Sequence, residues 1–401
     1  MNEMDGELPV LPSRRAGACP FDPSPQQARW RAATGPTKVS WNGVPVWAVN
    51  RFDDVRAALA DPAISSAIQG TALGDATGEI DGIPASFPRM DDPEHARLRK
   101  MLTDDFTVKR VRELRPKIQE IADAALDQMI ANGPPADLVR DYALPIPSMT
   151  ISLLLGVPYS DHELFERLSS TAFTIAATAK EKLNASIQLF SYLLELAKDA
   201  QQRPGDGLIS RSVQQHVASG DLTLEAVAIN SLVLLTAGHE TTANMIALGI
   251  LALLRNPETM ARVRHSPGPQ VMSKTVEELL RYLTIVQDLI VRVARKDVTI
   301  GDQLIRAGEG LFMNLPVANR DPAQFERPDV LDINLRRRGH VAFGHGIHNC
   351  LGQVLARVEL AVAYGTILRR LPSLHLAIPF GDVDFRHDMG TFGVHRLPVT
   401  W

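Results

Sequence analysis

The sequence of 401 residues contains only two cysteines, Cys19 and Cys350, so it has no disulfide framework. Aromatic residues make up 5% of the chain and charged residues 22%, whereas apolar residues reach 45%. This composition excludes a disordered or fibrous chain and is typical of a helix-rich globular protein. The formal net charge of −4 excludes a global basic field, which argues against nucleic acid as the main partner.

The sequence also lacks a repeat, a Gly/Ser linker and an apolar N-terminal stretch of signal-peptide length. We therefore expect one compact domain over 1–401, in a reducing cytoplasm and without a membrane anchor. The segment 226–254 is apolar enough to resemble a membrane span. His239 and Glu240 lie at its middle, where a carboxylate would be costly in lipid, so we interpret it as a helix buried in a protein core.

Apolar periodicity and turn residues predict the order of the elements. VSWNGVPVWAV at 39–49 predicts a hairpin around Asn42-Gly43, and strand-like segments follow at 289–300 and 303–313. The buried helix is expected to be capped by Thr223 and to stop at Asn256-Pro257. A long irregular segment covers 317–342. Further helices are expected at 52–61, 93–106, 109–132, 139–155, 160–201 and 270–284.

The most informative segment is FGHGIHNCLG at 343–352, a glycine-rich turn that carries Cys350 ahead of an apolar-periodic helix. Gly344 and Gly346 allow the backbone to curl so that N–H groups can point at a thiolate, and the positive end of the next helix adds to this. Such compensation fits a thiolate that ligates haem iron. A buried structural cysteine after a tight turn is the alternative, and the segment alone leaves both open.

The spacing of Phe343, Gly344, Gly346, His348, Cys350 and Gly352 resembles the signature of the cytochrome P-450 superfamily. Further stretches resemble the family in the right order over nearly the whole chain. The resemblance implies a mainly α cytochrome P-450 fold, with haem b between a long central helix and the cysteine loop. It also implies Cys350 as the axial ligand of the iron. The small β-rich lobe is expected at about 9–65, 289–313 and 374–401.

AGHETT at 237–242 places a carboxylate and two hydroxyls in the middle of the buried helix. A Thr hydroxyl can bond back to a backbone carbonyl and locally open the turn. The stretch resembles the family's oxygen-activation motif, in which an acid-alcohol pair delivers protons. By position this pair is Glu240 and Thr241, beside Ala237 and Gly238 at the haem.

Four basic residues match the family's ligands of the haem propionates: His95, Arg99, Arg292 and His348. His95 and Arg99 are four apart, hence on the same face of one helix. For each of the four residues alone, a solvated charge or a hydrogen-bonded histidine is the better interpretation. Their joint match to the family favours the propionate role, most strongly for Arg99 and His348.

Glu278 and Arg281 in EELLR resemble the family's buried pair that holds the irregular segment behind the haem. Val330 stands where many members have a third arginine. Arg320 or Arg327 is the expected substitute, unless the network is only a pair.

By resemblance, substrate contacts are expected from mostly apolar segments, which favours a hydrophobic substrate such as a macrolide, polyketide, terpenoid or sterol-like compound. These segments lie at about 66–90, at about 165–195 and at 389–392. The individual residues expected to contact substrate are Leu235, Ala237, Ile290, Val291 and Phe392.

The resemblance thus implies a monooxygenase that uses O2 and NAD(P)H, with electrons from a ferredoxin reductase and a ferredoxin. A basic patch is expected to bind an acidic ferredoxin; it comprises Arg99, Lys100, Lys109, Arg110 and 336–338. One rival is a peroxide-driven peroxygenase, which tends to lack the acid-alcohol pair. Another is a haem sensor, for which His239 is the candidate second axial ligand. Zinc held by His345, His348 and Cys350 lacks the separated ligand pairs typical of zinc sites.

Overall fold

The computed structural model describes residues 7–15, 19–77, 85–161, 164, 167–168, 171, 178–265, 268–334, 339–387 and 389–401. The chain forms two compact units. Unit 1 comprises Met1–Asp92, Leu251–Cys350 and Phe385–His395. Unit 2 comprises Pro93–Ile250, Leu351–Asp384 and Arg396–Trp401. The chain therefore passes from unit 1 to unit 2 directly after Cys350.

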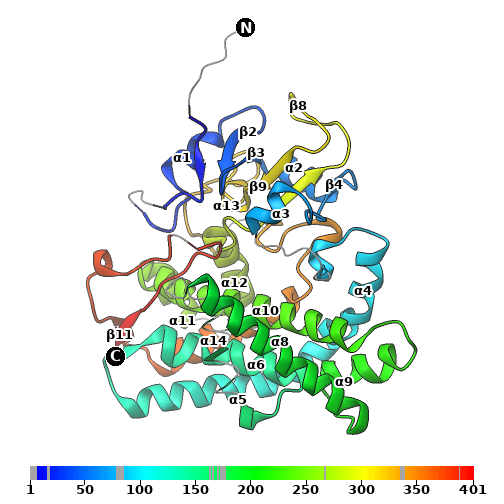
Figure 1. The fold of residues 1–401 in the computed structure, drawn as a ribbon. Coiled ribbons are helices and arrows are strands. Elements are labelled where there is room, and N and C mark those ends of the chain that lie inside the picture. The colour runs from blue at the N-terminus through cyan, green and yellow to red at the C-terminus, as the bar shows by residue number, and fades with distance from the viewer. Residues whose placement is uncertain are drawn as a thin grey trace. The chain divides into compact units, whose positions relative to one another are not determined.

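Unit 1 is built on a mixed β-sheet with the strand order β1-β2-β3-β9-β6-β4. The pairs β1/β2 and β3/β9 are parallel, and the other neighbouring pairs are antiparallel. In Figure 1 the blue β2 and β3 lie beside the yellow β9, although more than 250 residues separate β3 from β9 along the chain. The strands are β1 (Val10–Leu11), β2 (Thr37–Trp41), β3 (Val44–Val49), β4 (Ile64–Ser65), β6 (Val291–Ala294) and β9 (Gly310–Met313). A separate hairpin pairs β7 (Val298–Ile300) with β8 (Gln303–Ile305).

The hairpin predicted around Asn42-Gly43 is confirmed, because β2 and β3 pair in antiparallel register on either side of these two residues. Asn42 has φ +46° and Gly43 has φ +84°. Two positive φ angles are what a two-residue turn of type I′ requires, and Asn-Gly tolerates them best.

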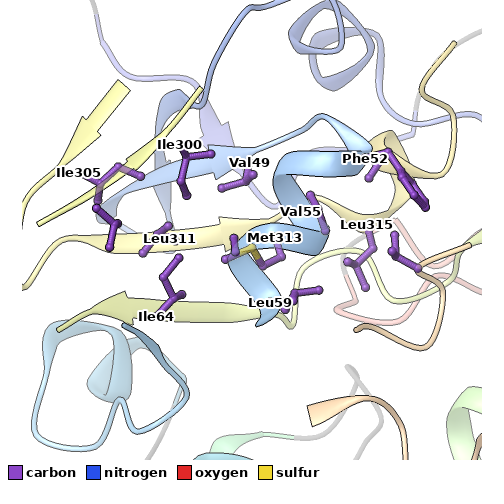
Figure 2. Packing of buried hydrophobic residues seen from close by; sticks show 14 of the residues in the cluster. Val49, Phe52, Val55, Leu59, Ile64, Ile300, Ile305, Leu311, Met313 and Leu315 are labelled. Atoms are coloured by element: carbon purple, nitrogen blue, oxygen red, sulfur yellow. The ribbon is translucent and has the colours of Figure 1, made fainter. Parts of the chain in front are cut away.

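An apolar cluster fills the space between this sheet and helix α2 (Phe52–Ala60). Figure 2 shows Val55 of α2 beside Met313 of β9, with Leu59 on the same helix. The helix repeats its apolar residues at the spacing that buries one face, which explains both the prediction over 52–61 and the packing. The other helices of unit 1 are α1 (Pro25–Trp30), α3 (Ala72–Thr77), η1 (Phe87–Arg89), α11 (Pro257–His265), α12 (Pro269–Leu283), α13 (Leu315–Ala318) and η6 (Gly346–His348).

Unit 2 is mainly helical, with a small antiparallel sheet of β5 (Ala136–Asp137), β11 (Pro398–Thr400) and β10 (His375–Leu376). Its helices are α4 (Glu94–Thr103), η2 (Asp104–Phe106), α5 (Val108–Asn132), η3 (Val139–Ala143), α6 (Pro145–Leu155), η4 (Tyr159–Asp161), α8 (Ala179–Gln202), α9 (Leu208–Ser212), η5 (Val213–Val217), α10 (Leu224–Leu254), α14 (Gln353–Arg370) and η7 (Phe380–Asp382). The last turn of α10 belongs to unit 1. The strands within the predicted β-rich stretch 374–401 thus pair inside the helical unit.

Helix α10 is the buried helix expected from the sequence, and α14 packs closely against it. The hydroxyl of Thr223 accepts a hydrogen bond from the amide of Ala226 (3.1 Å), which confirms the predicted N-cap. At Gly249 a Cβ atom would lie 2.1 Å from the hydroxyl oxygen of Tyr364, and that hydroxyl donates to the carbonyl of Met245 (2.5 Å). Only glycine therefore fits at position 249.

Most of the predicted helices are confirmed to within a few residues. The segment 160–201 contains α8, while parts of 162–177 lie outside the described residues. Helix α11 was not predicted, although Pro257 stands at its first turn, where proline is favoured. Within the described residues, no helix combines the length and the apolar character needed to cross a membrane.

Candidate functional site

The loop that carries Cys350 belongs to unit 1 and is closed by backbone hydrogen bonds. The amide of Cys350 donates to the carbonyl of Phe343 (2.9 Å), and the side-chain amide of Asn349 donates to the same carbonyl (3.2 Å). Gly344 and Gly346 have φ +71° and +73°, so the backbone curls at both glycines as predicted, through the left-handed region. Cys350 is half-buried and forms no disulfide, as a thiolate ligand requires.

Helix α2 supports this loop from one side. A Cβ atom at residue 346 would lie 2.4 Å from the carbonyl oxygen of Leu59, which is in the last turn of α2. Burial lowers the pKa of His345, and the positive charge of Arg56 on α2 lowers it further. The loop and α2 therefore pack with backbone against backbone, while the next residue, Ile347, leaves 48% of its surface exposed.

The environment of Arg292 on β6 shows whether unit 1 can bind the negatively charged groups of a cofactor. The side chain is buried, and burial lowers its pKa to about 10; Arg89 adds a smaller effect in the same direction, and Asp91 opposes both only in part. It donates to the carbonyl of Val291 (2.8 Å) and, among the described residues, forms no ion pair with a carboxylate. A buried cation without a carboxylate partner is costly. A haem propionate would supply the missing negative charge, so Arg292 fits its predicted role.

His348, the other propionate ligand expected in unit 1, lies in η6 and is half-buried. His95 and Arg99, the two expected in unit 2, lie one turn apart on α4, as their spacing predicts. His95 is buried and Arg99 is half-buried. The propionate role of all four residues stays a prediction.

The acid-alcohol pair lies on α10 in unit 2. The hydroxyl of Thr241 donates to the carbonyl of Ala237 (2.6 Å), so the predicted back-bond is present. The predicted opening of the turn is not seen, since α10 stays α-helical through this stretch. A carbonyl oxygen has two lone pairs and can accept both the hydroxyl and the helical amide. Glu240 and Thr241 are half-buried, and Ala237 is exposed.

The pair of Glu278 and Arg281 on α12 forms as predicted and holds the irregular segment after α13. Arg281 donates two hydrogen bonds to the carboxylate of Glu278 (2.7 and 2.9 Å). It also donates to the carbonyls of Asn319 (3.0 Å), Pro328 (2.8 Å) and Val330 (3.0 Å). Glu278 accepts from the amide of Asp332 (2.9 Å). In the described part of the chain, no second arginine bonds Glu278.

The two arginines considered as substitutes have other partners. Arg320 is 1% exposed and pairs with Asp22 (3.1 Å) and Asp329 (3.2 Å), and its guanidinium lies 4.0 Å from the centre of the Tyr282 ring. Arg327 pairs with Asp332 at the surface. The network at Glu278 is therefore a pair in which Arg281 donates to backbone carbonyls, including that of Val330, while Glu278 accepts from the amide of Asp332.

The predicted substrate contacts differ in their accessibility. Leu235, Val291 and Phe392 are completely buried. Ile290 is half-buried, and Ala237 is the exposed member of the set. The predicted loop at 66–90 and the segment 165–195 lie partly outside the described residues.

Sequence reasoning missed buried ionisable residues that carry no motif. Glu359 on α14 is 3% exposed, and burial raises its pKa to about 8. Asp288, in the loop before β6, is 5% exposed, and burial raises its pKa to about 7 against the opposing effect of Arg15. The sequence did contain a signal for Glu359, which is a single carboxylate within the apolar run of α14. It contained none for Asp288, because Arg15 lies far away in the chain.

The comparisons with known proteins agree on one family. A family model described as Cytochrome P450 matches residues 163–266 and 270–376. Cytochrome P450-SU2 of Streptomyces griseolus is 48% identical over 398 residues, which are 98% of this chain and 97% of that protein.

Two crystal structures extend the likeness to three dimensions. GfsF, a cytochrome P450 of Streptomyces halstedii, matches with a TM-score of 0.92 at 43% identity and covers 98% of this chain and 100% of that chain. The mycinamicin VIII C21 methyl hydroxylase of Micromonospora griseorubida, bound to mycinamicin VIII, matches with a TM-score of 0.88 at 38% identity over 98% of this chain and 100% of that chain. The cysteine loop, the α10 motif and the α12 pair thus occur in a chain that belongs to the cytochrome P450 family.

Proposed function

We propose that this cytochrome P450 monooxygenase inserts one oxygen atom of O2 into a C–H or C=C bond of a hydrophobic small molecule. Electrons would come from NAD(P)H through a ferredoxin reductase and a ferredoxin. Haem b, when bound, supplies the reduction of O2 that makes such an insertion feasible. The single observation that carries the proposal is the acid-alcohol pair on α10, with Thr241 bonded to Ala237, in a chain of this family.

Residues of the cysteine loop, β6, α4 and α10 would bind the haem. Cys350 would hold the iron, and His95, Arg99, Arg292 and His348 would bind the propionates. The buried charge of Arg292, which Asp91 offsets only in part, supports this assignment. Phe343, Gly344 and Gly352 would shape the cofactor-facing loop, and Ala237 and Gly238 would leave room for the cofactor on α10.

Glu240 and Thr241 would move the protons that oxygen reduction consumes. A hydroxyl that donates to its own helix keeps its oxygen free to accept a proton-donating water or acid. Glu240 is the adjacent acid on the same helix and is half-buried, so it can exchange protons with solvent.

The substrate class rests on the apolar character of the predicted contacts and on relatives. One relative binds mycinamicin VIII in its crystal structure. Others are named as a vitamin D3 dihydroxylase and as a pentalenic acid synthase. We infer a bulky hydrophobic substrate of macrolide, terpenoid or sterol-like type, held mainly by side chains such as Ile290 and Ala237.

Thr241→Ala tests the proton-delivery assignment. With a substrate found by its low-to-high-spin shift, the variant should bind normally and still consume NAD(P)H. Product should fall by about 10² or more while hydrogen peroxide is released, because a positioned proton donor contributes about 10² to 10⁴ in rate. NAD(P)H consumption, product and peroxide are measured together.

Thr241→Ser is the matched control, since it keeps the hydroxyl and should keep most of the coupling. Normal coupling in Thr241→Ala would refute the assignment. High turnover with added peroxide but not with NAD(P)H would instead identify a peroxygenase, and no turnover under either condition would indicate a sensor.

A further inference from the structure

Arg15, in the segment after β1, is a buried cation at the C-terminal end of α12. It is 3% exposed. Its guanidinium donates to the carbonyls of Leu283 (3.1 Å) and Thr284 (3.0 Å), and its Nε donates to the side-chain oxygen of Gln287 (2.9 Å). The planar guanidinium fixes the directions of these bonds, so Arg15 determines where the chain goes after α12.

Gln287 extends this connection to a second segment of unit 1. Its side-chain amide donates to the carbonyl of Met389 (2.7 Å), and its backbone amide donates to the carbonyl of Gly390 (3.0 Å). The amide of Phe392 donates back to the carbonyl of Ile285 (2.7 Å). Residues 285–288 and 389–392 therefore lie side by side, and Arg15 holds both through Gln287.

Arg15 also contacts the second segment directly. Its guanidinium carbon lies 4.2 Å from the centre of the Phe392 ring, which is fully buried and stacks on Phe385 at 5.8 Å. A cation over a ring face is attracted to it, more strongly when water is excluded. The ring is thus held from the side of Arg15, behind the turn at 389–392.

The charge of Arg15 is retained near neutral pH. Burial lowers its pKa to about 9, and Arg320 lowers it as well, while the carboxylates of Asp288 and Asp22 oppose both effects. The hydrogen bonds and the ring contact therefore involve a charged guanidinium, which strengthens them.

We infer that Arg15 is a positioning residue for substrate recognition, because it fixes the placement of residues 285–288 relative to residues 389–392. The first segment leads into Ile290–Val291, and the second is itself expected to contact substrate. This inference rests on the proposed function, which assigns substrate contacts to those segments. Arg15 itself would touch no substrate; it would determine how well the walls fit a large ligand.

The test compares Arg15→Met with Arg14→Met, which removes the exposed neighbouring arginine and serves as the matched control. Two azoles probe the haem-loaded protein by their Soret shifts: imidazole, which needs only the iron, and clotrimazole, whose three aromatic rings reach the walls. In Arg15→Met the Kd of clotrimazole should rise about tenfold, the effect of losing buried hydrogen bonds, while that of imidazole stays within about twofold. Arg15→Lys, which keeps the charge but not the planar fork, should lie between parent and Arg15→Met.

Hydrogen exchange of the same proteins gives a readout that does not depend on ligands. Peptides covering 285–292 and 389–394 should exchange faster in Arg15→Met, and a peptide from α14 should not. Gln287→Leu breaks the same connection to Met389 and provides the test if Arg15→Met does not fold.

Unchanged clotrimazole affinity in both variants, or equal weakening of the two azoles, would overturn the inference. A parent protein that binds neither azole and lacks the red-shifted ferrous carbonyl band would refute the proposed function instead. In that case the exchange data would still decide whether Arg15 positions the two segments.

Discussion

Glu359 is a buried carboxylic acid whose protonation couples the stability of unit 2 to pH. Burial raises its pKa to about 8, and the nearby hydroxyl of Thr150 opposes this only in part. An unfolded glutamate titrates near pH ~4.3. Between these two values the folded state binds one more proton than the unfolded state, so the free energy of unfolding falls as pH rises.

Glu359→Gln should remove this dependence, because glutamine keeps the shape of the neutral acid. Relative to the variant, the parent should lose up to about 1.4 kcal/mol of stability per pH unit between about pH 5 and 8. Chemical denaturation across this range measures the slope. Glu120→Gln, on the exposed face of α5, is the control and should leave the slope unchanged. Parallel slopes for parent and Glu359→Gln would contradict the assignment.

At the residue scale, the sequence predicted local chemistry better than partners in space. The back-bond of Thr241 and the pair of Glu278 and Arg281 need only the geometry of one helix, so their spacing was sufficient. The partners of Arg320 lie about 300 and 9 residues away in the chain, at Asp22 and Asp329. No local pattern could have shown that Arg320 and Arg327 both bond other carboxylates and that neither completes the network at Glu278.

At the scale of elements, Arg281 connects α12 to the irregular segment after α13 by hydrogen bonds. Arg281→Ala should destabilise the protein by about 3–5 kcal/mol, because it leaves Glu278 as a buried charge and releases three carbonyls. Yield of haem-loaded protein and urea denaturation measure the effect.

Arg327→Ala is the control for this prediction. Its side chain is 60% exposed and pairs with Asp332 at the surface, so the expected loss is below about 1 kcal/mol. Similar losses for the two variants would show that the carbonyl contacts of Arg281 contribute little.

Apart from helix α11, the elements that sequence reasoning missed have no apolar period of their own. Helices such as α2, α5 and α12 repeat apolar residues over several turns, and their bounds were predicted closely. Strands β5 and β11 have two and three residues and pair across more than 260 positions of sequence. Such short strands are defined by their partners, and only the tertiary structure shows that they belong to unit 2.

At the scale of the whole molecule, the proposed ferredoxin would be attracted by exposed basic residues. Lys100 and Lys109 are exposed at α4 and the start of α5, and Arg110 pairs with Glu113 (3.3 Å). The predicted residues 336–338 lie outside the described residues. Charge on such a surface raises the rate of encounter with an acidic partner.

Reversal of Lys109 and Arg110 to Glu should slow reduction by ferredoxin about tenfold at low salt and leave azole binding unchanged. The difference should shrink as salt rises, because the Debye length falls to about 3 Å at 1 M. Stopped-flow reduction under CO measures the rate. Lys117→Glu, further along α5 and paired with Glu120, is the control. If Lys117→Glu slows reduction as much as the double reversal, the docking surface does not centre on Lys109 and Arg110.

The family and its cofactor were predictable because their signature is contiguous, whereas the walls of the substrate site were not. Cys350 and its glycines fall within ten residues, and the loop closes on itself. The segments at 290 and 389, which the proposed function assigns to substrate, are connected through Gln287 to Arg15, which is far away in sequence. Composition shows such walls to be apolar, but their shape depends on contacts that no local pattern encodes.

The contact between Gly346 and Leu59 limits how this enzyme can be diversified. Since any side chain at 346 would overlap the backbone of α2, a library randomised there would return almost only glycine. Ile347, one residue further on, faces outward and would accept most replacements. In the cysteine loop, position 347 therefore tolerates substitution whereas its neighbour 346 does not. A surface label or an electrode linker is best attached through residue 347.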